Sequence, residues 1–100
     1  MKNNISPNEL RRAVEAKHGC RAGLSKSEFV KVHAAGSTIW EGLVHVFDLA
    51  GHPEAHQAYA WSSPVAGSNR SRQFSVLHLP PVTSPIDAVR VALGLENEMR

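Results

Sequence analysis

Two Ser-Pro sequences, one near each end of the chain, constrain its fold more than any other feature. Ser6-Pro7-Asn8-Glu9 and Ser84-Pro85-Ile86-Asp87 have the same layout. Serine stands at the N-cap, proline at the first helical position and an acid at the third, where its charge favours the positive end of a helix. The sequence therefore predicts one helix over about 7–18 and a second over about 85–93, each ended by the glycine that follows.

The segment between these helices changes to the alternating pattern that is typical of strands. The expected strands cover residues 28–33, 39–49, 57–62 and 74–79. The third is ambiguous, because proline at the start of 53–58 also suits a helix. Tyr59 and Trp61 favour a strand, since aromatic residues are enriched in sheets.

These elements predict an α+β fold with a helix, a four-stranded antiparallel meander and a second helix. With only two helices, we expect both to pack on one face of the sheet. The 100 residues fit one small domain over 1–100, with a flexible N-terminal arm over 1–5 and a frayed C-terminus over 95–100. Hydrophobic residues make up 42% of the chain and charged residues 20%, a balance that is typical of folded, soluble proteins.

The longest expected strand, 39–49, is apolar on both of its faces. One face carries Ile39, Leu43, Phe47 and Leu49, and the other carries Trp40, Val44 and Val46. A sheet that is open to water on one side alternates apolar and polar residues instead. If the helices cover one face, a second copy of the chain is the simplest cover for the other, so we expect a homodimer that forms through the sheet. Loops and the N-terminal arm are the alternative cover.

Several short motifs between Trp40 and Leu93 allow a comparison with other proteins. They are Trp40-Glu41-Gly42, Val46-Phe47-Asp48-Leu49, Gly51-His52-Pro53, Ala58-Tyr59-Ala60-Trp61, Leu79-Pro80-Pro81-Val82 and Ser84-Pro85. With these motifs the chain resembles a group of small uncharacterised bacterial proteins. The resemblance implies a bacterial source and a shared type of domain, and it implies no activity, cofactor or catalytic residue.

Histidines occur in two places that are candidates for a metal site. His52 and His56 lie four residues apart, and on a helix this spacing places both imidazoles on one face. On a strand they lie about 13 Å apart, which is too far for one ion. Because Pro53 interrupts the pair, we expect these imidazoles to cap backbone groups, with a metal-dependent site as the minor alternative. The second place is His18-Gly19-Cys20, where an imidazole and a thiol are both metal ligands. There we expect Gly19 to end the helix and Cys20 to pack as a small apolar residue.

The best candidate for ligand binding is the cationic loop that contains Asn69, Arg70 and Arg72. Guanidinium groups in a hairpin loop suit contacts with phosphate. The aromatic residues that would stack on bases if they were exposed are Trp40, Tyr59 and Trp61. The net charge of only +2 is not that of a dedicated nucleic-acid binder, so nucleic-acid binding is the alternative function.

No serine triad, nucleotide-binding loop or paired-carboxylate motif appears in the sequence. We therefore expect no cofactor, and a non-enzymatic binding or regulatory module whose partner is a second copy or another protein. The single cysteine, Cys20, fits a reducing compartment. No stretch approaches the roughly 18 apolar residues of a membrane span, and residues 1–7 lack the apolar core of a secretory signal. These features predict a cytoplasmic protein with no membrane partner.

Overall fold

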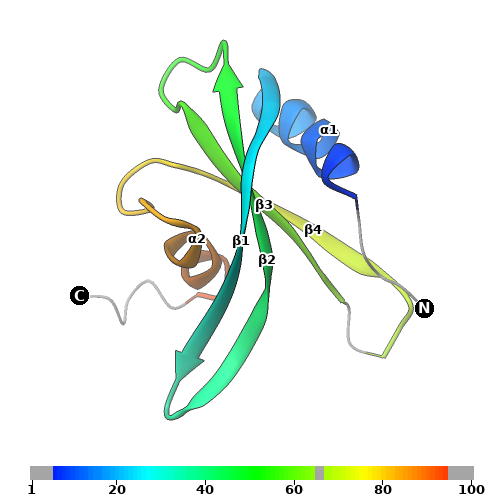
Figure 1. Ribbon diagram of the computed structural model, residues 1–100, viewed down its shortest axis with the longest axis vertical. Coiled ribbons are helices and arrows are strands. Elements are labelled where there is room, and N and C mark those ends of the chain that lie inside the picture. The colour runs from blue at the N-terminus through cyan, green and yellow to red at the C-terminus, as the bar shows by residue number, and fades with distance from the viewer. Residues whose placement is uncertain (1–5, 65–66, 95–100) are drawn as a thin grey trace.

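A four-stranded antiparallel sheet lies between two helices in the computed structural model, which describes residues 6–64 and 67–94 (Figure 1). The elements are α1 (Pro7–His18), β1 (Arg21–Ala34), β2 (Ser37–Ala50), β3 (Gln57–Pro64), β4 (Ser71–Leu77) and α2 (Pro85–Ala92). The strand order β1-β2-β3-β4 confirms the predicted α+β fold and its meander. The predicted arm over 1–5 and the predicted frayed end over 95–100 lie outside the described residues.

Both helices begin where the sequence predicts. The Ser6 hydroxyl accepts a hydrogen bond from the backbone N–H of Glu9 at 3.2 Å, and the Glu9 carboxylate accepts from the backbone N–H of Ser6 at 3.1 Å. This reciprocal pair is a capping box. Gly19 ends α1 in the left-handed conformation with φ 65°, which glycine adopts without steric cost. At the start of α2, the Ser84 hydroxyl accepts from the N–H of Asp87 at 3.3 Å.

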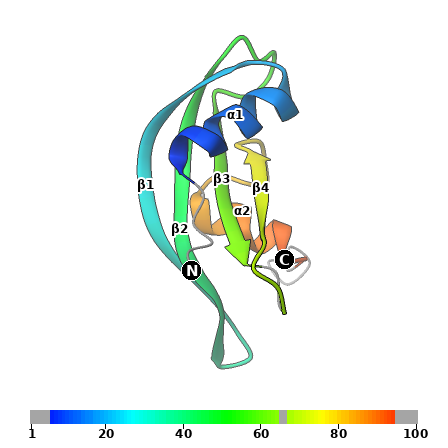
Figure 2. The ribbon, with the colours of Figure 1, turned by 90° about the vertical axis from the view of Figure 1, so that its right-hand side faces the viewer.

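β1 and β2 are each 14 residues long and pair along almost their whole length. β1 begins at Arg21, well before its predicted start, because its polar first half pairs with the apolar second half of β2. β2 meets β3 only where 45–48 pairs with 57–60. The other half of β1 and β2 therefore extends as a two-stranded ribbon, seen at the lower end of Figure 2. The pairing skips Ser25 and Ile39, which leaves a β-bulge at each.

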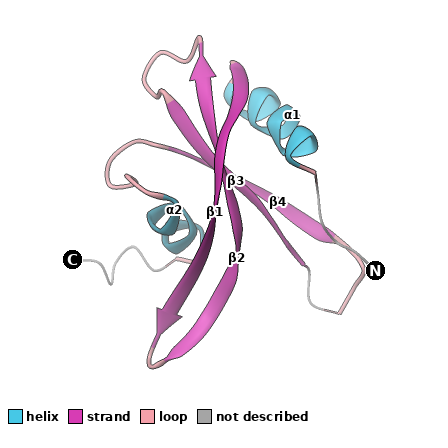
Figure 3. Cartoon of the chain, in the orientation of Figure 1, coloured by secondary structure: helices cyan, strands magenta, loops and turns pink. Residues whose placement is uncertain are grey.

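β3 forms where the sequence is compatible with either a strand or a helix, and the prediction of a strand is confirmed (Figure 3). Ala58 and Ala60 point to one side of the sheet, and Tyr59 and Trp61 point to the other. The small and the large side chains thus enter different halves of the core.

The two helices pack on opposite faces of the sheet, so the prediction that both share one face is wrong (Figure 2). The core on the α1 face consists of Leu10, Val14, Ala22, Phe47, Ala58 and Ala60. The core on the α2 face consists of Val30, Val32, Val44, Val46, Tyr59, Trp61, Val82, Ala88 and Val89. Because β2 and β3 are apolar on both sides, each face of the sheet needs a helix to cover it.

Neither helix covers the whole length of its face. α1 lies over the end of the sheet where β1 begins, and α2 lies on the other face beside the β1–β2 ribbon (Figure 1). α1 has 12 residues and rises about 1.5 Å per residue, whereas β1 has 14 residues and rises about 3.3 Å per residue, so the strand is much the longer element. The ribbon is therefore left without a helix on the α1 side.

Replacing Phe47 by alanine is expected to lower the free energy of unfolding by about 3–5 kcal/mol, because the ring is fully buried and its loss leaves a cavity. Urea unfolding at one fixed protein concentration measures the change. Leu93→Ala is the matched control: that side chain is 41% exposed, so its loss is expected to cost less than about 1 kcal/mol. Equal effects from the two substitutions would contradict the assignment of Phe47 to the core.

Candidate functional site

Two of the three aromatic residues that are candidates for stacking on bases lie inside the core. Trp61 and Tyr59 are only 2% and 3% exposed, so they do not meet the condition of exposure on which stacking with bases depends. Trp61 stacks on Phe74 with ring centroids 5.4 Å apart and meets the edge of Trp40 at 6.2 Å. Trp40 is half-buried, and its Nε1 donates to the Ser63 hydroxyl at 2.9 Å. Tyr59 and Trp61 are buried because side chains alternate along β3, and this alternation turns both rings toward α2.

The cationic loop is exposed, as the sequence predicts, but it has no stacking surface formed by Tyr59 and Trp61. Asn69 and Arg70 lie in the loop between β3 and β4, and the backbone N–H of Arg70 donates to the Ser68 hydroxyl at 3.1 Å. Arg72 lies in β4, where its guanidinium carbon is 5.7 Å from the centre of the Phe74 ring. This cation–π contact places Arg72 along its own strand.

His52 caps the turn that follows β2, which confirms the expected structural role. Its Nδ1 accepts hydrogen bonds from the backbone N–H groups of Glu54 and Ala55 at 3.1 and 3.0 Å. His56 is exposed, and its carbonyl oxygen accepts from the N–H of Leu49 at 2.8 Å. Within residues 6–64 and 67–94, no three His, Cys, Asp or Glu side chains are arranged to hold a metal ion.

A pair of histidines that the sequence did not indicate joins α1 to the rest of the fold. The rings of His18 and His52 lie 6.4 Å apart, edge to face. His18 Nε2 is 2.8 Å from the Ser75 hydroxyl, and Lys17 Nζ donates to the Ser75 carbonyl at 2.9 Å. Burial lowers the pKa of His18, and the neighbouring charges of Lys17 and His52 lower it further. Only the tertiary contact between α1, β4 and the turn after β2 creates this cluster.

A polar groove of about 340 Å³ lies on the α2 face, with Val46 and Tyr59 among its lining residues. Its polar groups bind one another. Lys26 Nζ lies 2.7 Å from Glu28 Oε2, and the Tyr59 hydroxyl lies 2.5 Å from His78 Nδ1. Burial raises the pKa of Tyr59, and the negative charges of Asp87 and Glu28 add to the effect. These four side chains already have partners within the chain, so none of them needs a ligand to satisfy its hydrogen bonds or charge.

The uncovered side of the β1–β2 ribbon has a different character. The exposed large apolar side chains of the two strands are Leu24 at 49%, Phe29 at 60%, Ile39 at 44% and Leu43 at 53%. Phe29 and Leu43 lie directly opposite each other in the pairing, and Leu24 lies opposite Phe47. Because side chains alternate along a strand, Leu24, Phe29 and Leu43 all point to the α1 side. We call the surface that they form the ribbon face. It also includes two polar pairs on the same side, Ser27 with His45 and Lys31 with Glu41.

Two polar pairs flank Phe29 and Leu43 on the ribbon face. On the side toward α1, the Ser27 hydroxyl lies 2.6 Å from His45 Nδ1, and burial lowers the pKa of His45. On the other side, Lys31 lies opposite Glu41. In the part of the chain that the structure describes, neither of these two charges forms an ion pair. The ribbon face is thus apolar at its centre, with one positive and one negative charge at its rim.

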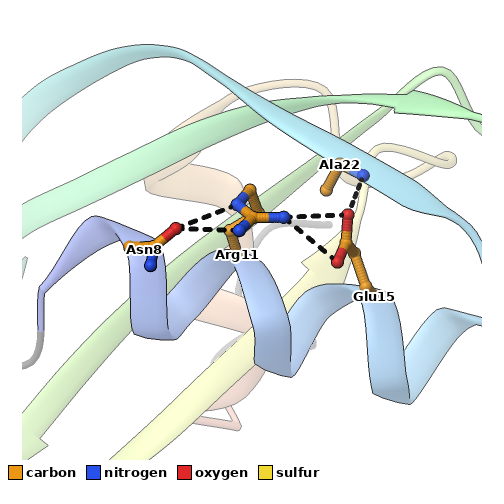
Figure 4. Close-up of polar contacts among 4 residues, drawn as sticks. All are labelled: Asn8, Arg11, Glu15 and Ala22. Atoms are coloured by element: carbon orange, nitrogen blue, oxygen red, sulfur yellow. Dashed lines mark hydrogen bonds and ion pairs between the residues drawn. The ribbon is translucent and has the colours of Figure 1, made fainter.

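A groove of about 350 Å³ continues the ribbon face toward α1. It is lined by Pro7, Asn8, Arg11, Leu24 and Phe47. Figure 4 shows how polar contacts hold its α1 wall in place. Arg11 binds Asn8 at 2.8 Å and Glu15 at 3.2 Å, and the Glu15 carboxylate accepts from the N–H of Ala22 in β1 at 2.9 Å. That backbone hydrogen bond lowers the pKa of Glu15.

Comparison with protein-family models, with curated proteins and with solved structures finds no match to this chain. The resemblance to a group of small bacterial proteins therefore stays a prediction, and function rests on the geometry of the chain itself. Among the helices of the described residues, none is long and apolar enough to cross a membrane.

Acid is expected to destabilise the fold through His18 and His45. Burial lowers the pKa of both below the ordinary value of 6.5, so the folded state disfavours their protonated forms. The unfolded chain then binds more protons, and the free energy of unfolding falls as the pH drops below about 6.5. Urea unfolding at pH 8, 6.5 and 5 measures this slope, in a range where most carboxylates stay ionised.

Two variants test whether His45 causes part of this pH dependence. His45→Gln is expected to lose less unfolding free energy between pH 6.5 and 5 than the unmodified protein, because one buried imidazole no longer titrates. His56→Gln, at an exposed position, is the control and is expected to keep the full loss. A stability that does not change from pH 8 to pH 5 in the unmodified protein would contradict the assignment.

Proposed function

We propose that this protein is a non-enzymatic binding module that acts as a homodimer, with the ribbon face as its interface. The observation that supports this is the adjacent pair Phe29 and Leu43, which are 60% and 53% exposed on a sheet face without a helix. Apolar patches of this kind on soluble proteins mark interaction sites. Full burial of one such side chain contributes about 1.5–3 kcal/mol.

The charges on the ribbon face favour a second copy of the chain as the partner. A symmetric dimer uses the same patch on both copies, so the patch must fit itself. Lys31 and Glu41 lie opposite each other on this face, which balances its charge. A patch of one sign would favour a partner of the opposite sign instead.

The free edge of β1 is less suited to association than its face. The bulge at Ser25 interrupts the pairing, and the strand carries two lysines, of which Lys26 is paired with Glu28 and Lys31 is not in an ion pair among the described residues. Bulges and lysines are features by which edge strands avoid pairing with other chains. We therefore assign the contact to the face of the ribbon.

The dimer proposed here differs in extent from the one that the sequence predicts. That prediction assumed that both helices share one face and that the whole opposite face needs cover. With one helix on each face, only the ribbon half of the α1 face is left for a partner. The proposed interface is accordingly smaller and is centred on Phe29 and Leu43.

Nucleic-acid binding has less support than the dimer. Burial of Tyr59 and Trp61 removes two of the three aromatic side chains on which bases would stack. The half-buried Trp40 and the cations Arg70 and Arg72 are left. Cations alone favour weak, salt-sensitive contact with any polyanion. We place the module in the cytoplasm, where a free, half-buried thiol such as Cys20 fits a reducing compartment.

The dimer is expected to dissociate when a charge enters the centre of the ribbon face. Sedimentation equilibrium at pH 8 is expected to give the mass of two chains for the unmodified protein. Leu43→Glu is expected to give the mass of one chain, because an unpaired carboxylate at an apolar interface must lose its hydration.

The control for this experiment is Ile86→Glu. Ile86 is 39% exposed and lies in the first turn of α2, away from the ribbon face. An acid is favourable in a first helical turn, so this variant is expected to remain folded and dimeric. A single-chain mass for the unmodified protein at about 100 μM, or a dimer that tolerates Leu43→Glu, would refute the proposed interface.

A further inference from the structure

α1 contributes to only one of the two cores of the fold. Its buried side chains are Leu10 and Val14, and both belong to the core on the α1 face. The larger core, on the α2 face, contains no residue of α1. Elements that bury few apolar side chains open locally at a lower cost than the whole fold. α1 can therefore leave the sheet while the α2 face stays packed.

The hydrogen bonds that join α1 to the strands lie in the second half of the helix. In the described residues they run from Glu15 to Ala22 of β1, and from Lys17 and His18 to Ser75 of β4. Ser75 is buried. Its carbonyl oxygen accepts from Lys17 Nζ at 2.9 Å, and its hydroxyl lies 2.8 Å from His18 Nε2. The last turn of α1 is thus the part of the helix that is fixed to β4.

The charged groups around the His18 ring are basic. Lys17 on its own helix and His52 in the turn after β2 act on it, and the His52 ring lies 6.4 Å away. β4 meets the ring with the neutral Ser75, and β1 begins with Arg21. The C-terminus of a helix favours a positive charge, which Lys17 already supplies. A proton on His18 therefore adds a further positive charge at a half-buried position, where desolvation opposes it.

The carboxylates near this cluster do not compensate such a charge. Glu15, which lies one turn before His18, binds Arg11 and the N–H of Ala22. Glu54 is in the same turn as His52, and it is exposed. Among the residues that the structure describes, neither carboxylate forms an ion pair with His18. The packed arrangement thus fits a neutral His18.

His52 also holds its turn only as a neutral ring. Its Nδ1 accepts hydrogen bonds from the backbone N–H groups of Glu54 and Ala55 at 3.1 and 3.0 Å. A protonated imidazole has no acceptor nitrogen, so a proton at Nδ1 breaks both hydrogen bonds. Because the rings of His18 and His52 meet edge to face, a change in this turn removes one wall of the site that His18 occupies.

We infer that His18, His52 and Ser75 form a proton-sensitive latch, which holds α1 on the sheet near neutral pH and releases it in weak acid. In the latched state both imidazole rings are neutral, whereas in the released state both are hydrated and free to bind protons. Burial lowers the pKa of His18 below its ordinary value of 6.5. The released state then binds more protons than the latched state, so it becomes more populated as the pH falls below about 6.5. The latch lies within one chain and does not depend on the proposed homodimer.

Release of α1 enlarges the apolar surface of the sheet. Phe47 and Ala58 pack beneath α1 and are fully buried. Phe47 lies four residues from Leu43 along β2, and both side chains point to the α1 side because side chains alternate along a strand. Their joint exposure extends the ribbon face toward β3. Weak acid thereby increases the apolar area that the α1 face presents to a partner.

Hydrogen exchange of the full chain, followed by mass spectrometry at pH 7.5 and 5.5, tests the latch. Each exchange rate is divided by the rate of an unstructured chain at the same pH, which gives the opening constant of that segment. The opening constant of α1 is expected to exceed that of β3 at both pH values. It is also expected to rise up to about tenfold through His18 at pH 5.5, because an imidazole with the ordinary pKa of 6.5 is then protonated by about ten to one.

Two variants remove the titration while they keep the hydrogen bonds. In His18→Gln, the side-chain amide takes the place of Nε2 beside the Ser75 hydroxyl, and in His52→Asn, the amide oxygen takes the place of Nδ1 as the acceptor in the turn. His18→Gln is expected to remove most of the rise in the opening constant of α1 at pH 5.5, and His52→Asn is expected to reduce it. His56→Gln, at an exposed position, is the control and is expected to keep the full rise.

Two results would overturn the latch. Equal opening constants for α1 and β3 at both pH values would mean that α1 leaves the sheet only when the whole chain unfolds. A full rise that persists in both His18→Gln and His52→Asn would mean that other groups cause the pH dependence. Neither result bears on the proposed homodimer, which the mass of the chain at pH 8 tests separately.

Discussion

In β2 and β3, neighbouring side chains point to opposite sides of the sheet, and both sides are apolar. Phe47 and Ala58 face α1, whereas Val46 and Tyr59 face α2. A sheet of this kind is stable in water only when each face is covered, because burial of apolar area is the main favourable term in folding. One helix on each face meets this demand, and the helices cannot share a face without exposing the other.

The strands are much longer than the helices that cover them, and this mismatch creates the surfaces available for binding. On the α2 face, the open part is a groove whose polar side chains bind one another, as Lys26 does with Glu28 and Tyr59 with His78. On the α1 face, the open part exposes Phe29 and Leu43. Polar groups with partners are stable in water, whereas a large apolar patch gains free energy from a cover. This contrast is the basis for assigning function to the ribbon face.

Histidines lie at both junctions of this architecture. His18 and His52 join the end of α1 to the sheet, and His45 sits between the covered and the uncovered half of the α1 face. Burial favours the neutral form of His18 and His45, so we expect weak acid to disfavour the attachment of α1 and the arrangement at the border of the proposed interface.

Local signals determined much of this protein. The serine caps, the glycine that ends α1 and the alternation of the strands predict the elements, their order and which residues of β2 share a face. They do not predict which face a helix covers, because alternation separates the two sides of a sheet without assigning a neighbour to either. That choice, made by tertiary packing, buried Tyr59 and Trp61, joined His18 to His52 and left Phe29 and Leu43 exposed on the ribbon.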